Sequence, residues 1–349
     1  MSDILYMKRC LQLAGMGAAS AAPNPMVGSV VVHNGRIIGE GYHRRCGEAH
    51  AEVNAIESVA DKSLLPQSTI YVNLEPCSHF GRTPPCADLI VSHHLKRAVI
   101  GCTDSFSEVS GRGIARMREA GISVDVGCLE EESRFINRRF FTFHEKKRPY
   151  IILKWAQTQD GFIDILHKGA SPKRGMWITN QASKELVHRW RTEEPAIMAG
   201  TGTLLTDNPQ LNVREWIGRD PVRIAPDRFG RLPEHLAVFD GLSPTVRYST
   251  LPVANTEQYD AVQLSESGFY EGIFADMHKR QLTSVIVEGG AQLLSYMIEN
   301  SLWDEARVFV GNKWFGEGLS APHFPFRPQY CQQIKDVELL HFFSNNHSK

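Results

Sequence analysis

The sequence predicts an α/β protein built from two domains. Short apolar runs of strand length alternate with helical segments along the chain, and 349 residues exceed what a single core usually covers. A basic stretch over 146–148, followed by Pro149, interrupts this alternation. We therefore expect a first domain over residues 1–145 and a second over 146–349.

The first domain is expected to open with an amphipathic helix within residues 1–20, followed by a β-hairpin. Two apolar strands flank Asn34-Gly35, a strong signal for a type I′ turn. The later elements are a helix opening at His50, a strand over 69–74, a helix starting near Pro85, a strand over 97–101, a helix over 113–120, a strand over 123–126 and a helix over 130–147. This order predicts helices around a mixed sheet.

The second domain alternates in the same way, with strands expected over 150–153, 196–200, 221–225 and 284–287. Thr201-Gly202-Thr203 is expected to be a loop. The last strand leads through two glycines into a helix over 291–299, where backbone N–H groups can hold phosphate. Two glycines after a strand are also common as a plain turn, so nucleotide binding and a simple turn both remain open.

Composition excludes several classes of protein. Apolar residues make up 42% and charged residues 22%, with a net charge of -1 and no basic stripe of the kind a dedicated nucleic-acid binder carries. No apolar run is long enough for a membrane span, and the charges within residues 1–20 argue against a signal peptide. The seven cysteines lack a disulfide pattern, so a cytoplasmic protein is expected.

The most informative motif is His50-Ala51-Glu52, followed by Cys77 and Cys86. One histidine and two cysteines suit a single Zn²⁺ ion and leave its fourth position open, as in catalytic sites. Two simpler interpretations are a Cys77–Cys86 disulfide and a core histidine at position 50. Neither explains a carboxylate two residues after the histidine.

This set of residues predicts hydrolytic deamination. Zinc can lower the pKa of bound water to about 7, which supplies hydroxide. Glu52 is placed to move protons from water to the ring nitrogen and the departing amine, as the non-ligand glutamate does in zinc deaminases. Because Cys86 stands at a predicted helix start, we expect its thiol pKa to be lowered.

The chain resembles the bifunctional riboflavin biosynthesis deaminase/reductase family over nearly its whole length. The long spacing between Cys77 and Cys86 is the most specific mark, because most other zinc deaminases have two residues there. The other segments that carry the resemblance are 23–28, 50–52, 75–86, Lys154 with Asp160-Gly161, 177–179, 203–214 and 288–290.

For the first domain, the resemblance implies a three-layer, cytidine-deaminase-like fold. The expected reaction is deamination of 2,5-diamino-6-(5-phosphoribosylamino)pyrimidin-4-one. His50, Cys77 and Cys86 match the zinc ligands of the family, and Glu52 matches its proton shuttle. The positions that match substrate contacts are Asn24, His43, His79 and Arg82. For the two histidines of this set, a surface or zinc-supporting role remains open.

For the second domain, the resemblance implies a dihydrofolate-reductase-like fold that uses NADPH to reduce the ribosyl group to ribityl. The positions that match cofactor contacts are Gln157, Trp177, Thr203, Asp207, Gly290, Ala291, Gln292 and Leu293. Those that match substrate contacts are Lys154, Arg191, Leu211, Arg214 and Glu288. For Lys154 a buried structural salt bridge remains open, and an isolated arginine such as Arg191 or Arg214 is often only surface charge.

Three features depart from the family pattern: Gly175 in place of a serine, a long basic loop over 165–174, and Pro226, which must end its strand. These departures leave the detail of the reductase site open.

Three alternative functions are a deaminase with a degenerate reductase domain, a tRNA adenosine deaminase and a non-catalytic zinc-stabilised binding protein. The tRNA enzyme would need a basic face and a short cysteine spacing, and the sequence shows neither. Glu52 argues against the binding protein, because a structural zinc site does not use an unligated carboxylate. Reductase domains of this type often pair, so a homodimer is expected.

Overall fold

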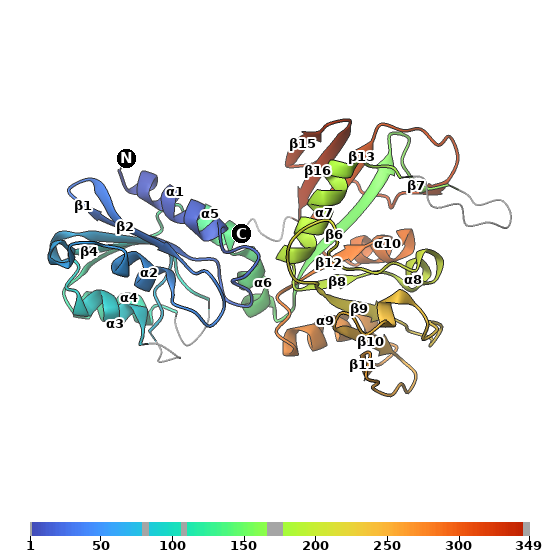
Figure 1. Cartoon of the computed structure of the whole chain (residues 1–349), viewed down its shortest axis with the longest axis horizontal. Coiled ribbons are helices and arrows are strands. Elements are labelled where there is room, and N and C mark those ends of the chain that lie inside the picture. Colours follow the sequence, from blue (N-terminus) through green and yellow to red (C-terminus); the bar gives the residue numbers. More distant parts are fainter. Residues whose placement is uncertain (1, 79–83, 106–109, 166–176, 345–349) are drawn as a thin grey trace. The chain divides into compact units, whose positions relative to one another are not determined.

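The computed structural model describes residues 2–78, 84–105, 110–165 and 177–344. The chain divides into two compact units, Met1–Lys147 and Arg148–Lys349 (Figure 1). None of the helices in the described ranges has the length and apolar character needed to cross a membrane.

The first unit contains a five-stranded mixed sheet of order β2-β1-β3-β4-β5. The strands are β1 (Gly28–His33), β2 (Arg36–Tyr42), β3 (Thr69–Leu74), β4 (Arg97–Cys102) and β5 (Ser123–Val126). Strand β1 is antiparallel to β2 and β3, whereas β3, β4 and β5 are parallel. Asn34 and Gly35 both have positive φ, which confirms the predicted type I′ turn.

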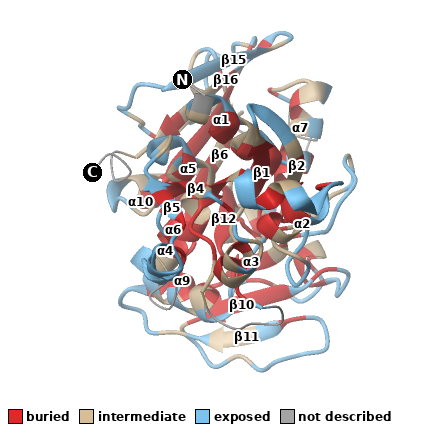
Figure 2. Ribbon diagram, turned by 90° about the vertical axis from the view of Figure 1, so that its left-hand side faces the viewer, coloured by how far each residue is buried: buried red, intermediate tan, exposed pale blue. Residues whose placement is uncertain are grey.

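Helices cover both faces of this sheet, which confirms the three-layer prediction. Helix α1 (Ser2–Gly15) packs on one face through Met7 and Cys10. Helices α2 (Ala51–Glu57), α3 (Cys86–Ser92) and α4 (Arg112–Glu119) pack on the other face. Most residues of β1 and β4 are consequently buried (Figure 2).

The single helix predicted over 130–147 is wrong, because the segment forms α5 (Glu130–Ile136) and α6 (Arg138–Lys146). Asn137 leaves the helical conformation between them, with φ -99° and ψ 18°. Its side-chain oxygen accepts a hydrogen bond from the Met26 N–H at 2.8 Å, and its amide donates to the Met26 carbonyl at 2.9 Å. This contact with a distant segment outweighs local helix propensity.

The second unit contains a nine-stranded sheet of order β11-β10-β9-β8-β12-β6-β13-β16-β15. The strands are parallel from β11 to β13, and β16 and β15 complete it antiparallel. Their bounds are β6 (Tyr150–Thr158), β8 (Ala196–Met198), β9 (Val222–Pro226), β10 (Thr245–Ser249), β11 (Asp260–Gln263), β12 (Ser284–Glu288), β13 (Glu305–Gly311), β15 (Tyr330–Ile334) and β16 (Val337–Phe343). A two-stranded sheet pairs β7 (Phe162–Asp164) with β14 (Leu319–Ser320).

Helices also cover both faces of the larger sheet. Helices α9 (Phe269–Lys279) and α10 (Ala291–Glu299) contribute to the core on one face, and α7 (Gln181–Glu193) and α8 (Thr201–Asp207) to the cores on the other. Strand β9 ends at Pro226, as predicted. The departures at Gly175 and in the loop after Ile165 lie in residues 166–176, outside the described ranges.

The loop predicted at Thr201-Gly202-Thr203 is wrong, because these residues form the first turn of α8. Gly200 precedes the helix in an extended conformation, and the Thr201 hydroxyl donates to the Pro226 carbonyl at 2.7 Å. Leu204 is fully buried, so its packing fixes a short helix that threonine and glycine alone would not favour.

Candidate functional sites

The first candidate site brings together His50, Cys77 and Cys86. His50 immediately precedes α2, Cys77 lies in the segment after β3, and Cys86 begins α3. The His50 Nδ1 atom lies 3.6 Å from the Cys77 Sγ and 3.3 Å from the Cys86 Sγ. All three ligand atoms lie within 4.8 Å of one another.

These separations fit one zinc ion. Zn–S bonds of about 2.3 Å and Zn–N bonds of about 2.0–2.1 Å place tetrahedral ligands about 3.6 Å apart. The Cys86 N–H donates to the Cys77 sulfur at 3.3 Å, which stabilises a thiolate at Cys77. The geometry therefore suits a metal ion held by three protein ligands.

Glu52 lies in the first turn of α2 and is only 3% exposed. Because His50 lies just outside the helix in an extended conformation, its side chain can approach the same site as that of Glu52. The Glu52 carboxyl group contacts the Cys86 thiol, and burial raises its pKa to about 7. A carboxyl group with such a pKa can both accept and release a proton near neutral pH.

The predicted direction of the Cys86 pKa is wrong. A hydrogen bond to Cys77, together with burial, raises the pKa of the Cys86 thiol. The same hydrogen bond lowers the pKa of Cys77 to about 4. Within this pair, the neighbouring sulfur outweighs the helix start at Cys86.

Asn24 and His43 form a polar pair in the same unit. The Asn24 Nδ2 lies 3.1 Å from the His43 Nε2, and the His43 Nδ1 lies 3.2 Å from the Ala49 carbonyl oxygen. The carbonyl can only accept, so Nδ1 carries the proton and Nε2 accepts from the Asn24 amide. The His43 ring also meets the His50 ring edge-on, with centroids 5.4 Å apart. The predicted residues His79 and Arg82 lie outside the described ranges.

Two asparagines that sequence reasoning missed hold the segment that contains Asn24. The Asn73 side chain accepts from the Gly28 N–H at 2.8 Å and donates to the Met26 carbonyl at 3.1 Å. Asn137 contacts Met26 as described above. Both are ordinary polar residues in the sequence, and their partners are distant, so no local signal marks them.

The second candidate site centres on Glu288 at the end of β12. Glu288 pairs in register with Lys154 on β6, and the Lys154 Nζ lies 3.6 Å from a Glu288 carboxylate oxygen. Arg191 on α7 donates to both carboxylate oxygens, at 3.0 and 2.8 Å. The structure thus brings together three of the residues that were predicted to contact the substrate of the second domain.

Electrostatics fix the charge of this carboxylate. Burial alone would raise the pKa of Glu288, but Arg191 and Lys154 outweigh it and lower the pKa to about 2. Glu288 therefore stays ionised at neutral pH. A third Arg191 donor, Nη1, binds the Asn212 carbonyl oxygen at 2.8 Å.

The segment with Leu211 and Arg214 lies beside this cluster. Leu211 is buried with a φ of 51°, which a branched residue rarely adopts. The Arg214 N–H donates to the His188 Nδ1 at 3.2 Å, and its Nη1 donates to the Asn212 side chain at 3.1 Å. Burial, together with Arg191 and Arg214, lowers the pKa of His188 to about 4. Sequence reasoning missed His188, a neutral acceptor that holds the Arg214 backbone.

The starts of helices α8 and α10 lie side by side and offer a cradle for a phosphorylated cofactor. Gly289 and Gly290 have φ values of 84° and 77°, and a Cβ at either would meet the Thr203 side chain. A Cβ at Gly200 would meet Leu293 at 3.3 Å. The first N–H groups of a helix have no partner within the helix, so two such ends can bind phosphate oxygens.

The remaining predicted cofactor residues occupy other positions. Asp207 ends α8, one turn after Thr203. The Gln157 side chain on β6 accepts from the Trp155 indole N–H at 2.8 Å. Trp177 is 59% exposed, with the Lys184 ammonium 5.3 Å from its ring centroid.

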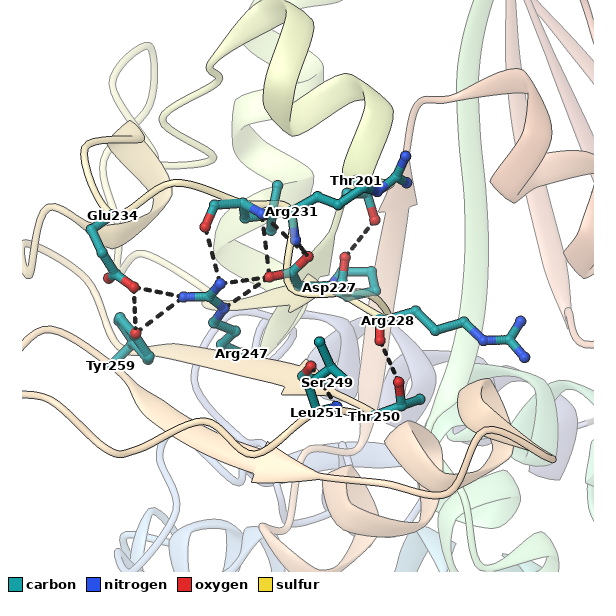
Figure 3. Close-up of polar contacts among 12 residues, drawn as sticks. Thr201, Asp227, Arg228, Arg231, Glu234, Arg247, Ser249, Thr250, Leu251 and Tyr259 are labelled. Atoms are coloured by element: carbon teal, nitrogen blue, oxygen red, sulfur yellow. Dashed lines mark hydrogen bonds and ion pairs between the residues drawn. The ribbon is translucent and has the colours of Figure 1, made fainter.

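A buried polar network supports the cradle from the end of β9 and the middle of β10 (Figure 3). Arg247 donates to one Asp227 carboxylate oxygen at 3.0 and 2.6 Å, and Asp227 accepts from the Arg231 N–H at 2.7 Å. The network fixes the turn after Pro226, whose carbonyl accepts from Thr201 at the start of α8.

Comparisons with known proteins match both units. Residues 1–102 match the cytidine and deoxycytidylate deaminase zinc-binding region, and residues 149–342 match the RibD C-terminal domain. Riboflavin biosynthesis protein RibD of Aquifex aeolicus is 39% identical over 328 residues, covering 91% of this chain and 89% of that protein. The protein of the same name from Escherichia coli is 33% identical over 338 residues, covering 90% and 89%.

Solved structures agree over nearly the whole chain. A Thermotoga maritima diaminohydroxyphosphoribosylaminopyrimidine deaminase/5-amino-6-(5-phosphoribosylamino)uracil reductase matches with a TM-score of 0.87 and 36% identity, covering 97% of this chain and 98% of that one. Acinetobacter baumannii RibD matches with a TM-score of 0.86 and 30% identity, covering 98% of each chain. The chain therefore belongs to the RibD family of riboflavin biosynthesis proteins, which joins a deaminase domain to a reductase domain.

Proposed function

We propose that the chain catalyses two successive steps on small phosphorylated pyrimidines. The first unit deaminates 2,5-diamino-6-(5-phosphoribosylamino)pyrimidin-4-one, and the second reduces the ribosyl group of the product to ribityl with NADPH. The observation that carries the proposal is the convergence of His50, Cys77 and Cys86 beside the buried Glu52, in a chain whose other unit matches the family's reductase domain.

In the first step, His50, Cys77 and Cys86 would hold one zinc ion. When bound, zinc would lower the pKa of its water and so supply a nucleophile at neutral pH. The Glu52 carboxylate accepts a proton from the attacking water and delivers it to the ring nitrogen next to the carbon under attack. After the C–O bond has formed, Glu52 transfers the remaining proton of the new hydroxyl group to the amino group, and the C–N bond breaks to release ammonia.

Asn24, His43, His79 and Arg82 are proposed to hold this substrate. The hydrogen bonds of His43 to Asn24 and to the Ala49 carbonyl hold its ring in one orientation beside His50. The same geometry supports a second role for His43, in which its edge orients the His50 ring.

In the second step, the starts of α8 and α10 would hold the phosphates of NADPH, which would supply the hydride. Thr203, Asp207 and residues 290–293 would line this part of the site. Gln157 and Trp177 would contact the cofactor from β6 and from the segment before α7.

Lys154 is proposed to hydrogen-bond the reacting sugar in its ring-opened imine form. Glu288 balances its charge, and Arg191 completes the ion pair. Arg214 and Leu211 would border the phosphate end of the substrate. Because Arg191 already donates to Glu288 and to the Asn212 carbonyl, we infer that it holds these two residues in place as well as contacting the substrate phosphate.

The proposal also includes a cytoplasmic location, since two zinc-binding cysteines need a reducing compartment, and a homodimer, since reductase domains of this type often pair. Light scattering over a range of protein concentrations would measure the mass of the assembly. A monomer at every concentration would remove the dimer from the proposal.

The test incubates zinc-loaded protein with the diaminopyrimidinone phosphate, with and without NADPH. Ammonia release and loss of NADPH absorbance are followed together. We expect ammonia in both samples and NADPH loss that depends on prior deamination. Ammonia without NADPH loss would contradict the reductase half, and absence of ammonia would contradict the deaminase half.

A further inference from the structure

Glu75 is a buried carboxylate immediately before Pro76 and Cys77, and neither the deaminase nor the reductase step described above uses it. It is 4% exposed. One carboxylate oxygen accepts from the N–H groups of Asp104 and Gly111, at 3.2 and 3.0 Å. The other accepts from Gly113 and Ile114, at 3.1 and 3.3 Å.

These four hydrogen bonds make Glu75 a remote cap for helix α4. Gly111 precedes the helix with a φ of 75° and supplies no side chain to cap it. The N–H groups of Gly113 and Ile114 belong to the first helical turn, and a carboxylate at a helix N-terminus is favoured by the helix dipole. The capping group thus comes from a segment more than 35 residues away in the chain.

Contact between α4 and Pro76 makes this attachment rigid. A Cβ at Gly113 would lie 2.2 Å from the Pro76 carbonyl oxygen, so only glycine lets the helix approach so closely. The Glu75 N–H donates to the Cys102 carbonyl at 3.0 Å, which fixes the backbone from the neighbouring strand. The backbone that leads into Cys77 is therefore held on two sides.

Cys77 itself is held from its other side by α3. Its carbonyl accepts from the Ala87 N–H at 3.1 Å, and its sulfur accepts from the Cys86 N–H at 3.3 Å. The position of the Cys77 sulfur relative to the His50 ring thus depends on how α4 holds Glu75 and Pro76.

We propose that Glu75 is a positioning residue for the metal site: by capping α4 it fixes the Cys77 thiolate at the distance from His50 and Cys86 that one zinc ion requires. The inference rests on the proposed zinc site. It assigns Glu75 no contact with substrate or metal.

The pattern of donors predicts how substitutions behave. In Glu75→Gln, one oxygen still accepts two N–H groups, but the amide NH₂ faces the other two and repels them. Glu75→Asp keeps both oxygens on a side chain that is shorter by one methylene. We therefore expect zinc affinity to fall about 10–100-fold for the glutamine variant, the usual effect of losing a residue that orients a metal ligand, and less for the aspartate variant.

The experiment loads the full-length chain with Co²⁺, measures the thiolate-to-cobalt charge-transfer and d–d absorption bands, and measures zinc affinity by competition with a chelator. Gly113→Ala is the second variant, because it keeps the carboxylate but pushes against Pro76. Met117→Ala is the matched control, because it removes core packing from α4 without touching Glu75.

The proposal expects weaker zinc binding and altered cobalt bands in Glu75→Gln and Gly113→Ala, with wild-type bands in Met117→Ala. Wild-type bands and affinity in both Glu75→Gln and Gly113→Ala would overturn it. Equal changes in Met117→Ala would also overturn it, because general destabilisation of α4 would then explain the effect. If the wild-type chain itself showed no thiolate-to-cobalt bands, the proposed zinc site would fail instead.

Discussion

Two buried glutamates, one in each unit, show how surroundings decide what a carboxyl group can do. Glu52 lies among His50, Cys77 and Cys86, and burial raises its pKa to about 7. Glu288 is also buried, yet Arg191 and Lys154 lower its pKa to about 2. The first glutamate can exchange protons, whereas the second is a fixed negative charge that organises two cations.

The largest expected effect comes from Glu52→Gln, which removes the proton carrier and keeps the shape of the side chain. General acid–base catalysis contributes about 10²–10⁴-fold, so we expect ammonia release to fall by about that factor or more. Zinc content and NADPH-dependent reduction of the deaminated substrate should not change. Ammonia release at the wild-type rate with full zinc content would show that Glu52 is not the proton carrier.

Glu288→Gln tests whether the second glutamate acts as a fixed negative charge. The change leaves Arg191 and Lys154 as buried cations without a carboxylate, and breaking a buried ion pair costs about 3–5 kcal/mol. All six tryptophans lie in the second unit, so tryptophan fluorescence during urea unfolding measures the stability of that unit.

Lys154→Met is the matched control, because it leaves the Arg191–Glu288 pair in place. We expect this variant to lose reductase activity while its free energy of unfolding changes far less than that of Glu288→Gln. Equal stability of the two variants would show that Glu288 does not organise the fold around it.

The pH dependence of the unfolding free energy should distinguish the contribution of His188 from that of Glu288. The pKa of His188 is lowered from 6.5 to about 4, so the unfolded chain binds more protons between these values and stability falls as pH falls through that window. By pH 4.5 the expected loss is about 2 to 3 kcal/mol, at about 1.4 kcal/mol per pKa unit. Glu288 contributes little to the change there, because its stabilising charge is lost only below its unfolded pKa of 4.5.

His188→Gln keeps a side-chain acceptor for the Arg214 N–H but does not titrate. The difference in unfolding free energy between this variant and the wild type, measured by tryptophan fluorescence at several pH values, isolates the histidine. A difference that stays constant between pH 6.5 and 4.5 would contradict the prediction.

The smallest expected effect concerns the cofactor cradle. Alanine at Gly290 would be strained at a φ of 77° and would meet the Thr203 hydroxyl at 3.2 Å, at a cost of about 1–3 kcal/mol. We expect NADPH to bind about tenfold more weakly in Gly290→Ala, measured by calorimetry. Gly202→Ala is the control, because a Cβ there meets nothing within 4 Å, so its NADPH affinity should match the wild type.

Much of the fold could be predicted from local patterns. The strand over 69–74, the strand over 123–126 and the helix over 291–299 have the predicted bounds. Apolar patterning sets all three, and glycines flank the second and third. The prediction failed where distant contacts decide. Asn137 breaks a helix to bind Met26, and the burial of Leu204 creates helix α8.

The candidate sites divide in the same way. The zinc cluster was visible because its residue types and spacing are rare, and its histidine and second cysteine are 36 residues apart. The Arg191–Glu288 pair spans 97 residues, so the sequence suggested each member but not their contact. Glu75 lies in the segment 75–86 that carries the resemblance, but the sequence assigned it no role, and His188 gave no signal. A carboxylate that accepts backbone N–H groups and a neutral histidine look like any others until their partners are known.

Each sheet draws all its strands from one unit, and Arg148, at the start of the second, is tied to Asp304 of the same unit at 2.5 and 2.8 Å. A genetic crossover between the codons for Lys147 and Arg148 would therefore transfer a whole sheet with its own core and its own reactive groups. Evolution can replace, duplicate or discard either half of such a gene without rebuilding the other, so the two activities can have separate histories within one coding sequence.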